Sequence, residues 1–255
     1  MNFRTFMAML GRDAHVARRN AIQLTFQTLL QPMLFVFVFG RVMTASGLMN
    51  AQYKALLLPG IIALAMVMSG TWAVTMPLIS EFQFTKEIED RLLAPMNIEW
   101  LAVEKVVSGM AQAMAAGMVV IPTAWLVMGG VTFAGTHMLL FVLIAFLVAG
   151  LSATLGLVLG CSIGQQHVGL MFSMVMAPMI FFGCTYYPWA ALSKFPILQR
   201  VVLINPIVYA SEGFRSALVP QSPHLALYAI IGALVVFDSV FLLFGLRQFR
   251  RKAIS

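Results

Sequence analysis

The chain has 255 residues, of which 61% are hydrophobic and only 10% are charged, and its net charge is +7. A soluble domain of this length could not bury so much apolar surface, so the composition excludes a water-soluble globular protein. Apolar runs of about 20 residues, long enough to cross a bilayer as a helix, recur along the chain, and the basic residues gather in the termini and loops, which favours anionic lipid headgroups over nucleic acid as their partner.

Residues 1–20 carry apolar side chains on one helical face and basic side chains on the other. This pattern predicts an amphipathic helix at the membrane interface, although an ordinary basic leader before a first span would have a similar composition. Arginines 4, 12, 18 and 19 interrupt any compact apolar run, so we expect no cleavable signal peptide.

Residues 22–42 predict the first span. Gln23, Gln27 and Gln31 form a polar stripe at helical spacing that ends at Pro32. Because polar side chains are costly in hydrocarbon, the stripe should face protein or a water-filled path. Hydrogen bonds between helices explain the stripe at least as well as a substrate path does.

Three further spans are predicted at residues 55–80, 106–128 and 138–160. The last two have small residues four positions apart, which indicates close helix contacts: Gly109, Ala113, Gly117, Ser152, Gly156, Gly160 and Gly164. No Gly-Lys dipeptide occurs in the sequence, so the chain has no P-loop for a nucleotide.

Residues 81–105, between the second and third spans, hold most of the charge outside the termini. Read as a helix over 81–93, the stretch places Phe84, Ile88 and Leu92 on one apolar stripe, and Pro95 ends the helix. A short amphipathic helix between two spans must lie at a membrane face. It is either a solvated connector or a docking helix for a soluble partner.

Residues 168–182 predict a short fifth span, and residues 225–246 predict the sixth. The segment 183–223 between them is too polar to span, and we expect a re-entrant pair of short amphipathic helices. One helix lies around Trp189, Leu192 and Phe195, and the other covers residues 207–218. Asp238 in the sixth span is a candidate for an ion or proton role, although a hydrogen-bonded structural carboxylate is the alternative.

The distribution of basic residues predicts the orientation. With both termini in the cytosol, 11 Lys and Arg residues lie inside and 5 lie outside, as the positive-inside rule requires. The stretch 81–105 is then cytosolic and the segment 183–223 is extracellular. Cys161 and Cys184 fall near opposite faces, so we expect no disulfide between them.

Two stretches resemble the short six-span permeases of ABC-2 type transporters, which include drug-resistance, nodulation-factor and O-antigen exporters. Residues 88–105, IEDRLLAPMNIEWLAVEK, are similar to the cytosolic coupling segment of that family. Residues 181–218 match its pattern of Gly, Tyr-Pro, Pro, Asn-Pro, Tyr and Arg, which fall here at Gly183, Tyr187, Pro188, Pro196, Asn205, Pro206, Tyr209 and Arg215. Residues 82–85 depart from the family, because many relatives are more charged there.

The resemblance implies an all-α membrane protein: an interfacial helix at 1–20, then a transmembrane domain at 21–255 with six spans, the coupling helix and the re-entrant helices. It implies a bacterial inner-membrane exporter of a drug, lipid or glycan. The chain would hold no cofactor, and two partner ATPase subunits would bind ATP and Mg. A second permease, identical or paralogous, would complete the complex.

The resemblance also implies roles for particular residues. Contacts with the ATPase would come from Phe84, Ile88, Glu89, Leu92, Ala94 and Pro95. A translocation path or dimer interface would involve Gln23, Gln27, Gln31, Phe35, Met174 and Phe181. An extracellular gate would involve Tyr186, Tyr187, Pro188, Trp189, Asn205, Pro206, Tyr209 and Arg215.

Two other classes of function remain as alternatives. An ion-coupled secondary transporter should have several ionisable groups inside its spans and internal repeats, whereas this sequence offers Asp238 and no clear repeat. An intramembrane enzyme would need a catalytic pair, and the four histidines lie in tails, loops or span ends.

Overall fold

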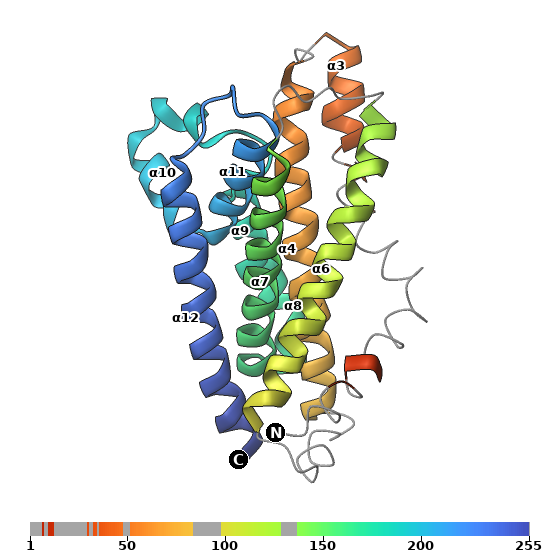
Figure 1. Ribbon diagram of the computed structural model, residues 1–255, viewed down its shortest axis with the longest axis vertical. Helices are drawn as coiled ribbons and strands as arrows, with labels where there is room; N and C mark the ends of the chain where they lie inside the picture. The colour runs from red at the N-terminus through yellow and green to blue at the C-terminus, as the bar shows by residue number, and fades with distance from the viewer. Residues whose placement is uncertain are drawn as a thin grey trace.

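The computed structural model describes residues 7, 10–12, 30, 33–34, 36–47, 52–83, 98–128 and 137–254. Four long helices run along its longest axis: α4 (Gln52–Gln83), α6 (Ile98–Met128), α7 (Met138–Ser162) and α12 (Leu227–Ile254) (Figure 1). Each is long and apolar enough to cross a membrane. No strand occurs within the described ranges, so the all-α membrane class is confirmed.

These four helices correspond to the second, third, fourth and sixth predicted spans. Most of the interfacial helix and about half of the first predicted span lie outside the described residues, which show there the short helices η1 (Val36–Val42) and α3 (Met43–Ala45) and a few isolated positions. The described ranges therefore hold four candidate spans, and the predicted total of six remains a prediction.

Small residues let α4 pack closely against α6 and α7, as their spacing predicts. A Cβ at Gly109 of α6 would lie 2.3 Å from a methyl carbon of Val74 on α4. A Cβ at Gly156 of α7 would lie 2.7 Å from the carbonyl oxygen of Thr71, also on α4. Larger side chains at these two glycines would force the helices apart, so the predicted small-residue contacts are confirmed.

Polar side chains reinforce the same contact. The hydroxyl of Thr71 donates to the carbonyl of Ser152 at 3.2 Å, and that of Thr75 donates to the carbonyl of Gly156 at 3.1 Å. Both threonines are buried. Their hydrogen bonds satisfy groups that would otherwise be costly in an apolar interior.

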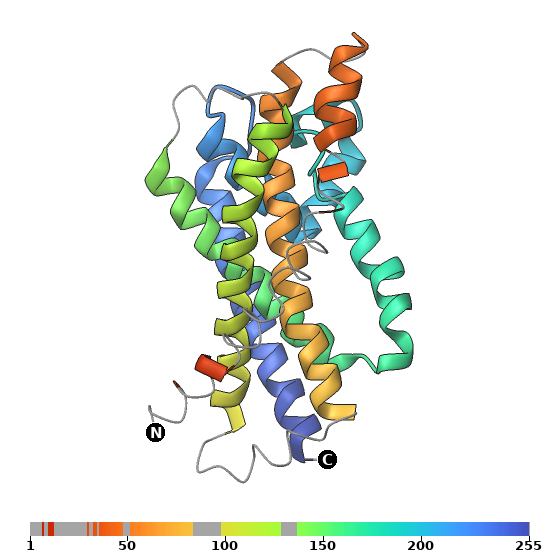
Figure 2. The same cartoon turned by 90° about the vertical axis from the view of Figure 1, so that its right-hand side faces the viewer.

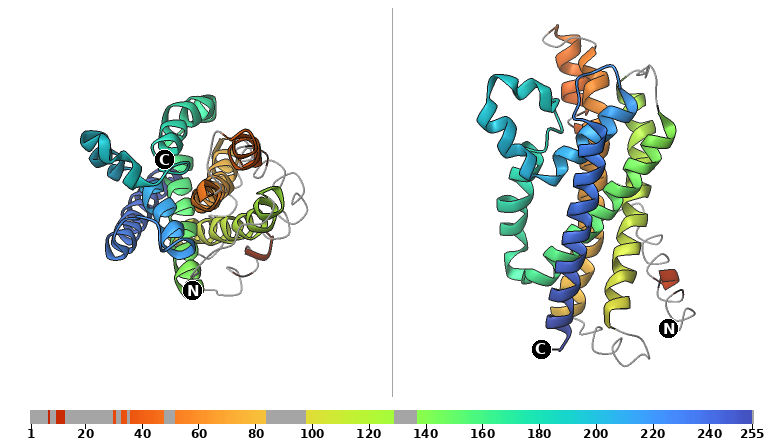
Figure 3. Two further views of the ribbon diagram at one scale, coloured as in Figure 1. Left: turned by 90° about the horizontal axis from the view of Figure 1, so that it is seen from above. Right: turned by 60° about the vertical axis from the view of Figure 1, so that its left-hand side comes forward.

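The predicted fifth span is a short apolar helix over Val168–Phe181. It consists of α8 (Val168–Met171), the π-helical turn η3 (Phe172–Met176) and α9 (Ala177–Phe181), and it follows the 3-10 turn η2 (Gln165–His167). In Figures 2 and 3 this helix runs along the periphery of the bundle. A stack of Trp72 of α4 on Phe172, with ring centroids 3.8 Å apart, connects it to the rest of the fold.

The segment between the fifth and sixth predicted spans folds into short helices at one end of the bundle: η4 (Trp189–Lys194), α10 (Pro196–Val201), η5 (Val202–Ile204) and α11 (Pro206–Leu218). We call this the α11 end, and the opposite end, where α12 finishes, the C-terminal end (Figure 1). The helix predicted at residues 207–218 corresponds to α11. α11 is helical as expected, but nearly all its residues are buried, because α4, α7 and α12 surround it.

At the C-terminal end, α4 and α6 extend into the stretch expected to connect them. α4 continues to Gln83, and α6 begins at Ile98 instead of near Val106. Glu81, Glu104 and Lys105 are consequently buried helical residues and not parts of a solvated connector. Residues 84–97 lie outside the described ranges.

Candidate functional site

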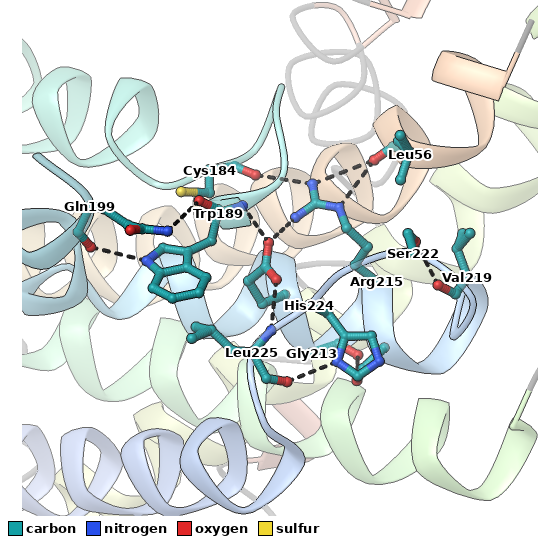
Figure 4. A network of polar contacts seen from close by, with 12 residues as sticks. Leu56, Cys184, Trp189, Gln199, Gly213, Arg215, Val219, Ser222, His224 and Leu225 are labelled. Carbon is teal, nitrogen blue, oxygen red and sulfur yellow. Dashed lines mark hydrogen bonds and ion pairs between the residues drawn. The ribbon is translucent and has the colours of Figure 1, made fainter. Parts of the chain in front are cut away.

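A buried ion pair between Glu212 and Arg215 forms the centre of the α11 end (Figure 4). The two residues are three positions apart on α11, which places them on one helical face. Both side chains are fully buried, at 0% exposure. Two charges in such a place are tolerable only when each is paired and hydrogen-bonded.

The start of α11 is fixed by its sequence. Pro206 occupies the first turn, where its missing N–H costs nothing. Asn205 caps the helix: its Oδ1 accepts from the N–H of Ile207 at 3.0 Å. Its Nδ2 donates to the carbonyl of Met179 at 2.6 Å and so ties α11 to the end of α9.

Arg215 connects α11 to two other segments. Its Nη1 donates to Glu212 Oε1, and its Nη2 donates to the carbonyl of Cys184 at 3.1 Å. Nε and Nη2 both lie 3.4 Å from the carbonyl oxygen of Leu56 in α4. The guanidinium thus uses its several donors to hold a loop and a helix against α11.

Glu212 makes the complementary connections. Its Oε1 accepts from the backbone N–H of Trp189 at 2.9 Å, and its Oε2 accepts from that of Leu225 at 3.1 Å. Trp189 begins η4, and Leu225 leads into α12. Together with the contacts of Arg215, these hydrogen bonds define a group that we call the Glu212–Arg215 network. It consists of Leu56, Cys184, Trp189, Glu212, Arg215 and Leu225. It joins α11 to four other segments, namely α4, the turn at Cys184, the start of η4 and the approach to α12, through charge-assisted hydrogen bonds.

The turn over residues 182–188 packs directly on α4. A Cβ at Gly60 would lie 1.8 Å from the carbonyl oxygen of Thr185, so only glycine permits this approach. The hydroxyl of Tyr53 donates to the carbonyl of Tyr186 at 2.6 Å. Cys184 adopts φ of 52°, in the left-handed region that few residues other than glycine occupy.

The electrostatics of the turn keep its thiol neutral. Burial raises the pKa of Cys184 to about 12, and the Glu212 carboxylate adds to this effect, while Arg215 opposes it. Burial likewise raises the pKa of Tyr53 above its usual value, against the opposing influence of Arg215. Both groups are therefore protonated at neutral pH. Cys161 is also a free, buried thiol, as expected.

The structure brings together most of the predicted gate residues. Trp189 and Arg215 are members of the network, Tyr186 contributes a carbonyl to the turn, and Asn205 and Pro206 begin α11. The others brace neighbouring turns. The hydroxyl of Tyr187 donates to the carbonyl of Phe181 at 3.0 Å, and that of Tyr209 donates to Leu203 at 2.8 Å. Pro188 directly precedes η4.

Sequence reasoning did not place Glu212, Cys184, Leu56 or Gly60 at this site. A signal for Glu212 was present, because it is the one acidic residue between Glu104 and Asp238 and it precedes an arginine by three positions. Leu56 and Cys184 contribute through backbone carbonyls. Every residue type has a backbone carbonyl, so the sequence carries no signal for such a contact.

A second charged group, which we call the Glu81–Lys105 cluster, lies at the C-terminal end. Lys105 Nζ is 2.8 Å from Glu81 Oε1 and 4.0 Å from Glu104 Oε2. All three residues are buried. They join the last turns of α4 to the first turns of α6, on either side of residues 84–97.

Of the predicted path and coupling residues, only two are described. Met174 and Phe181 are exposed on the peripheral helix, as a path or an interface would require, and their role remains a prediction. Outside the described ranges lie Gln23, Gln27, Gln31, Phe35, Phe84, Ile88, Glu89, Leu92, Ala94 and Pro95.

Asp238 lies where α12 meets α7. A Cβ at Gly150 of α7 would be 3.1 Å from Asp238 Oδ2, so the glycine makes room for the carboxylate. Within the described residues, the buried Oδ1 atom has no hydrogen-bond partner. The same ranges contain no group of three His, Cys, Asp or Glu residues that could hold a metal ion.

Comparison with known proteins adds one match. The family model described as ABC-2 type transporter matches residues 4–219, which include both charged sites. No curated protein matches the chain.

Proposed function

Because the chain belongs to the ABC-2 type transporter family, we propose that it is the permease subunit of an ABC exporter, powered by ATP hydrolysis on separate subunits. The family match over residues 4–219 is the observation that carries this proposal. The substrate class that we propose is amphipathic: a drug, a lipid, or a glycolipid or glycan. A dimer of permeases with two ATPase subunits is the proposed assembly.

The position of residues 84–97 supports a role in coupling. The segment connects α4 to α6 at the C-terminal end of a bundle whose long helices can each cross a membrane. We propose that it lies at one membrane face. There the stripe of Phe84, Ile88 and Leu92 is proposed to dock on the ATPase, with Glu89, Ala94 and Pro95 beside it.

The proposed orientation rests on the distribution of basic residues along the sequence. We assign the C-terminal end, with both termini, to the cytosol of a bacterial inner membrane, and the α11 end to the outside. The Glu212–Arg215 network would then hold the outer end of the path closed until the ATPases act. Its hydrogen bonds to four segments make it suitable for a gate that opens as one unit.

Co-purification tests the proposal. We expect the permease to bring down an ATPase with a P-loop, and Phe84→Asp, Ile88→Asp or Leu92→Asp to abolish that association while the permease still inserts. Lys86→Ala is the matched control, because position 86 lies about 200° around the same predicted helix from position 84. Transport by vesicles that contain no ATPase would overturn the proposal.

An ion-coupled secondary transporter remains the alternative. Its best support is Asp238, a carboxylate inside a candidate span with one oxygen that lacks a hydrogen-bond partner in the described ranges. This alternative predicts that purified permease alone moves substrate in response to an ion gradient.

A further inference from the structure

The Glu81–Lys105 ion pair lies at the base of the proposed coupling segment. Glu81 is in the last turn of α4, and Lys105 is about two turns into α6. The two are 24 positions apart in sequence, yet Lys105 Nζ donates to Glu81 Oε1 at 2.8 Å. Both side chains are buried, at 3% and 9% exposure. The pair therefore bridges the last turn of α4 and the first turns of α6.

Stability alone does not explain charges at this position. Apolar residues of similar size often stabilise a buried site at least as well as an ion pair does. An ion pair, in contrast, has a preferred distance and direction between its two groups, so it can set the register of the two elements that it joins. Glu104 Oε2, at 4.0 Å from the same ammonium group, adds a second carboxylate from α6.

The last turn of α4 is also tied to α12 and α7. The ring of Phe82 packs edge-on against Phe249 of α12, with centroids 5.5 Å apart. Lys252 Nζ lies 4.8 Å from the centroid of the Phe82 ring and 3.5 Å from the carbonyl oxygen of Gly160 in α7. A displacement of the end of α4 would thus reach α6, α7 and α12 together.

We propose that the Glu81–Lys105 ion pair is a clamp that makes α4 and α6 move as one unit when the coupling segment is displaced. This inference rests on the proposed function. Glu81 and Lys105 are positioning residues, acting through the helices that they hold. Without the clamp, motion of residues 84–97 would separate the ends of α4 and α6 instead of moving the bundle.

The test uses the permease–ATPase complex with spin labels at Met76 of α4 and Met118 of α6, both exposed positions. Their separation is measured without nucleotide and with ATP trapped by vanadate. In the otherwise unaltered complex we expect one narrow distance distribution, equal in both states. In Glu81→Gln and Lys105→Met complexes we expect the distribution to broaden and shift when ATP is trapped.

A second label pair, at Met76 and Gly232, reports transmission across the bundle. Gly232 lies in α12, and no atom lies within 4 Å of the position that a Cβ would take there, so a label fits. The distances between these two labels give the populations of the conformations without nucleotide and with trapped ATP. In the clamp variants, the change that ATP causes in the ratio of these populations should be smaller by about two- to thirtyfold, the usual range for residues that carry coupling. ATPase binding should be retained.

Two controls make the test decisive. Glu99→Gln removes an exposed pair, Arg250–Glu99 at 4.0 Å with 65% and 62% exposure, and should leave both label pairs unchanged. The exchange Glu81→Lys with Lys105→Glu keeps both charges and should restore the narrow distribution. If a single variant fails to fold, this exchanged variant still tests whether the ion pair acts as a clamp. Unaltered distributions in the single variants, or an exchanged variant that stays broad, would overturn the clamp. Failure of the unsubstituted permease to bind an ATPase would instead overturn the proposed function.

Discussion

Gly60 of α4 and Thr185 meet through their backbones: a Cβ on Gly60 would be 1.8 Å from the carbonyl oxygen of Thr185. The turn over residues 182–188 therefore rests on the helix with no side chain between them. The hydroxyl of Tyr53 donates to the carbonyl of Tyr186 in the same turn, and the carbonyl of Leu56 accepts from Arg215 of α11. The first turns of α4 form the surface on which the Glu212–Arg215 network is assembled.

Gly60→Ala should displace the turn and destabilise the protein. The added methyl group would meet backbone atoms, which cannot rotate away, so we expect a cost of about 1–3 kcal/mol, as for other overpacked sites. Thermal unfolding of the purified protein in detergent measures it. Gly232→Ala is the matched control, because nothing lies within 4 Å of that position and alanine favours a helix more than glycine does. Equal unfolding temperatures for the two variants would contradict the described contact.

Removing both partners of the buried ion pair should cost less than the sum of the two single removals. Glu212→Gln or Arg215→Met alone leaves a charge at a site with 0% exposure, with an expected cost of about 3–5 kcal/mol. The double variant leaves neither charge, so its cost should be less than the sum of the two. Unfolding free energies of the four proteins give the coupling energy. Strict additivity would show that the two side chains do not depend on each other.

The sequence predicted the long helices better than it predicted their ends. Apolar runs and small residues four apart placed α4, α6, α7 and α12 and their contacts, because the membrane sets both length and polarity. The start of α6 was misplaced, since Glu104 and Lys105 suggested a solvated connector. In the structure these charged residues are buried near Glu81, a neighbour that only the three-dimensional fold provides.

The candidate site could be predicted only in part from the sequence. The helix predicted from residue 207 begins as α11 directly after Asn205, and asparagine and proline are residue types that favour a helix start. The sequence did not show how deeply that helix is buried, because it contains the charged residues Glu212 and Arg215. They neutralise each other inside the protein, and periodicity cannot distinguish a paired buried charge from a solvated one.

Cys184 predicts a response of the α11 end to alkaline pH. Its pKa is raised to about 12, above the usual value for a thiol, so the folded protein favours the protonated form. The contribution of this thiol to the free energy of unfolding is fully present below the pKa that it has in the unfolded chain, and it is lost as the pH rises toward 12. Unfolding temperatures should therefore fall between pH 9 and 12 more steeply for the natural protein than for Cys184→Ser. Parallel curves would show that the thiol does not contribute.

Asp238→Asn distinguishes the exporter from the ion-coupled alternative and also tests the packing of α12 on α7. One oxygen of this carboxylate is buried with no hydrogen-bond partner in the described part of the chain, and an amide costs less to bury than a charged group does. If Asp238 serves no ion, the variant should keep its ATPase partner and unfold at an equal or higher temperature, by about 2–4 °C for each kcal/mol gained. Ser239→Ala is the control, because the hydroxyl of Ser239 is exposed and donates within its own helix to Val235 at 2.7 Å. An ion-coupled transporter would instead lose its gradient-driven transport in Asp238→Asn while its folding and expression stayed normal. That result would favour the alternative, because a neutral amide can neither release a proton nor bind a cation as a carboxylate does.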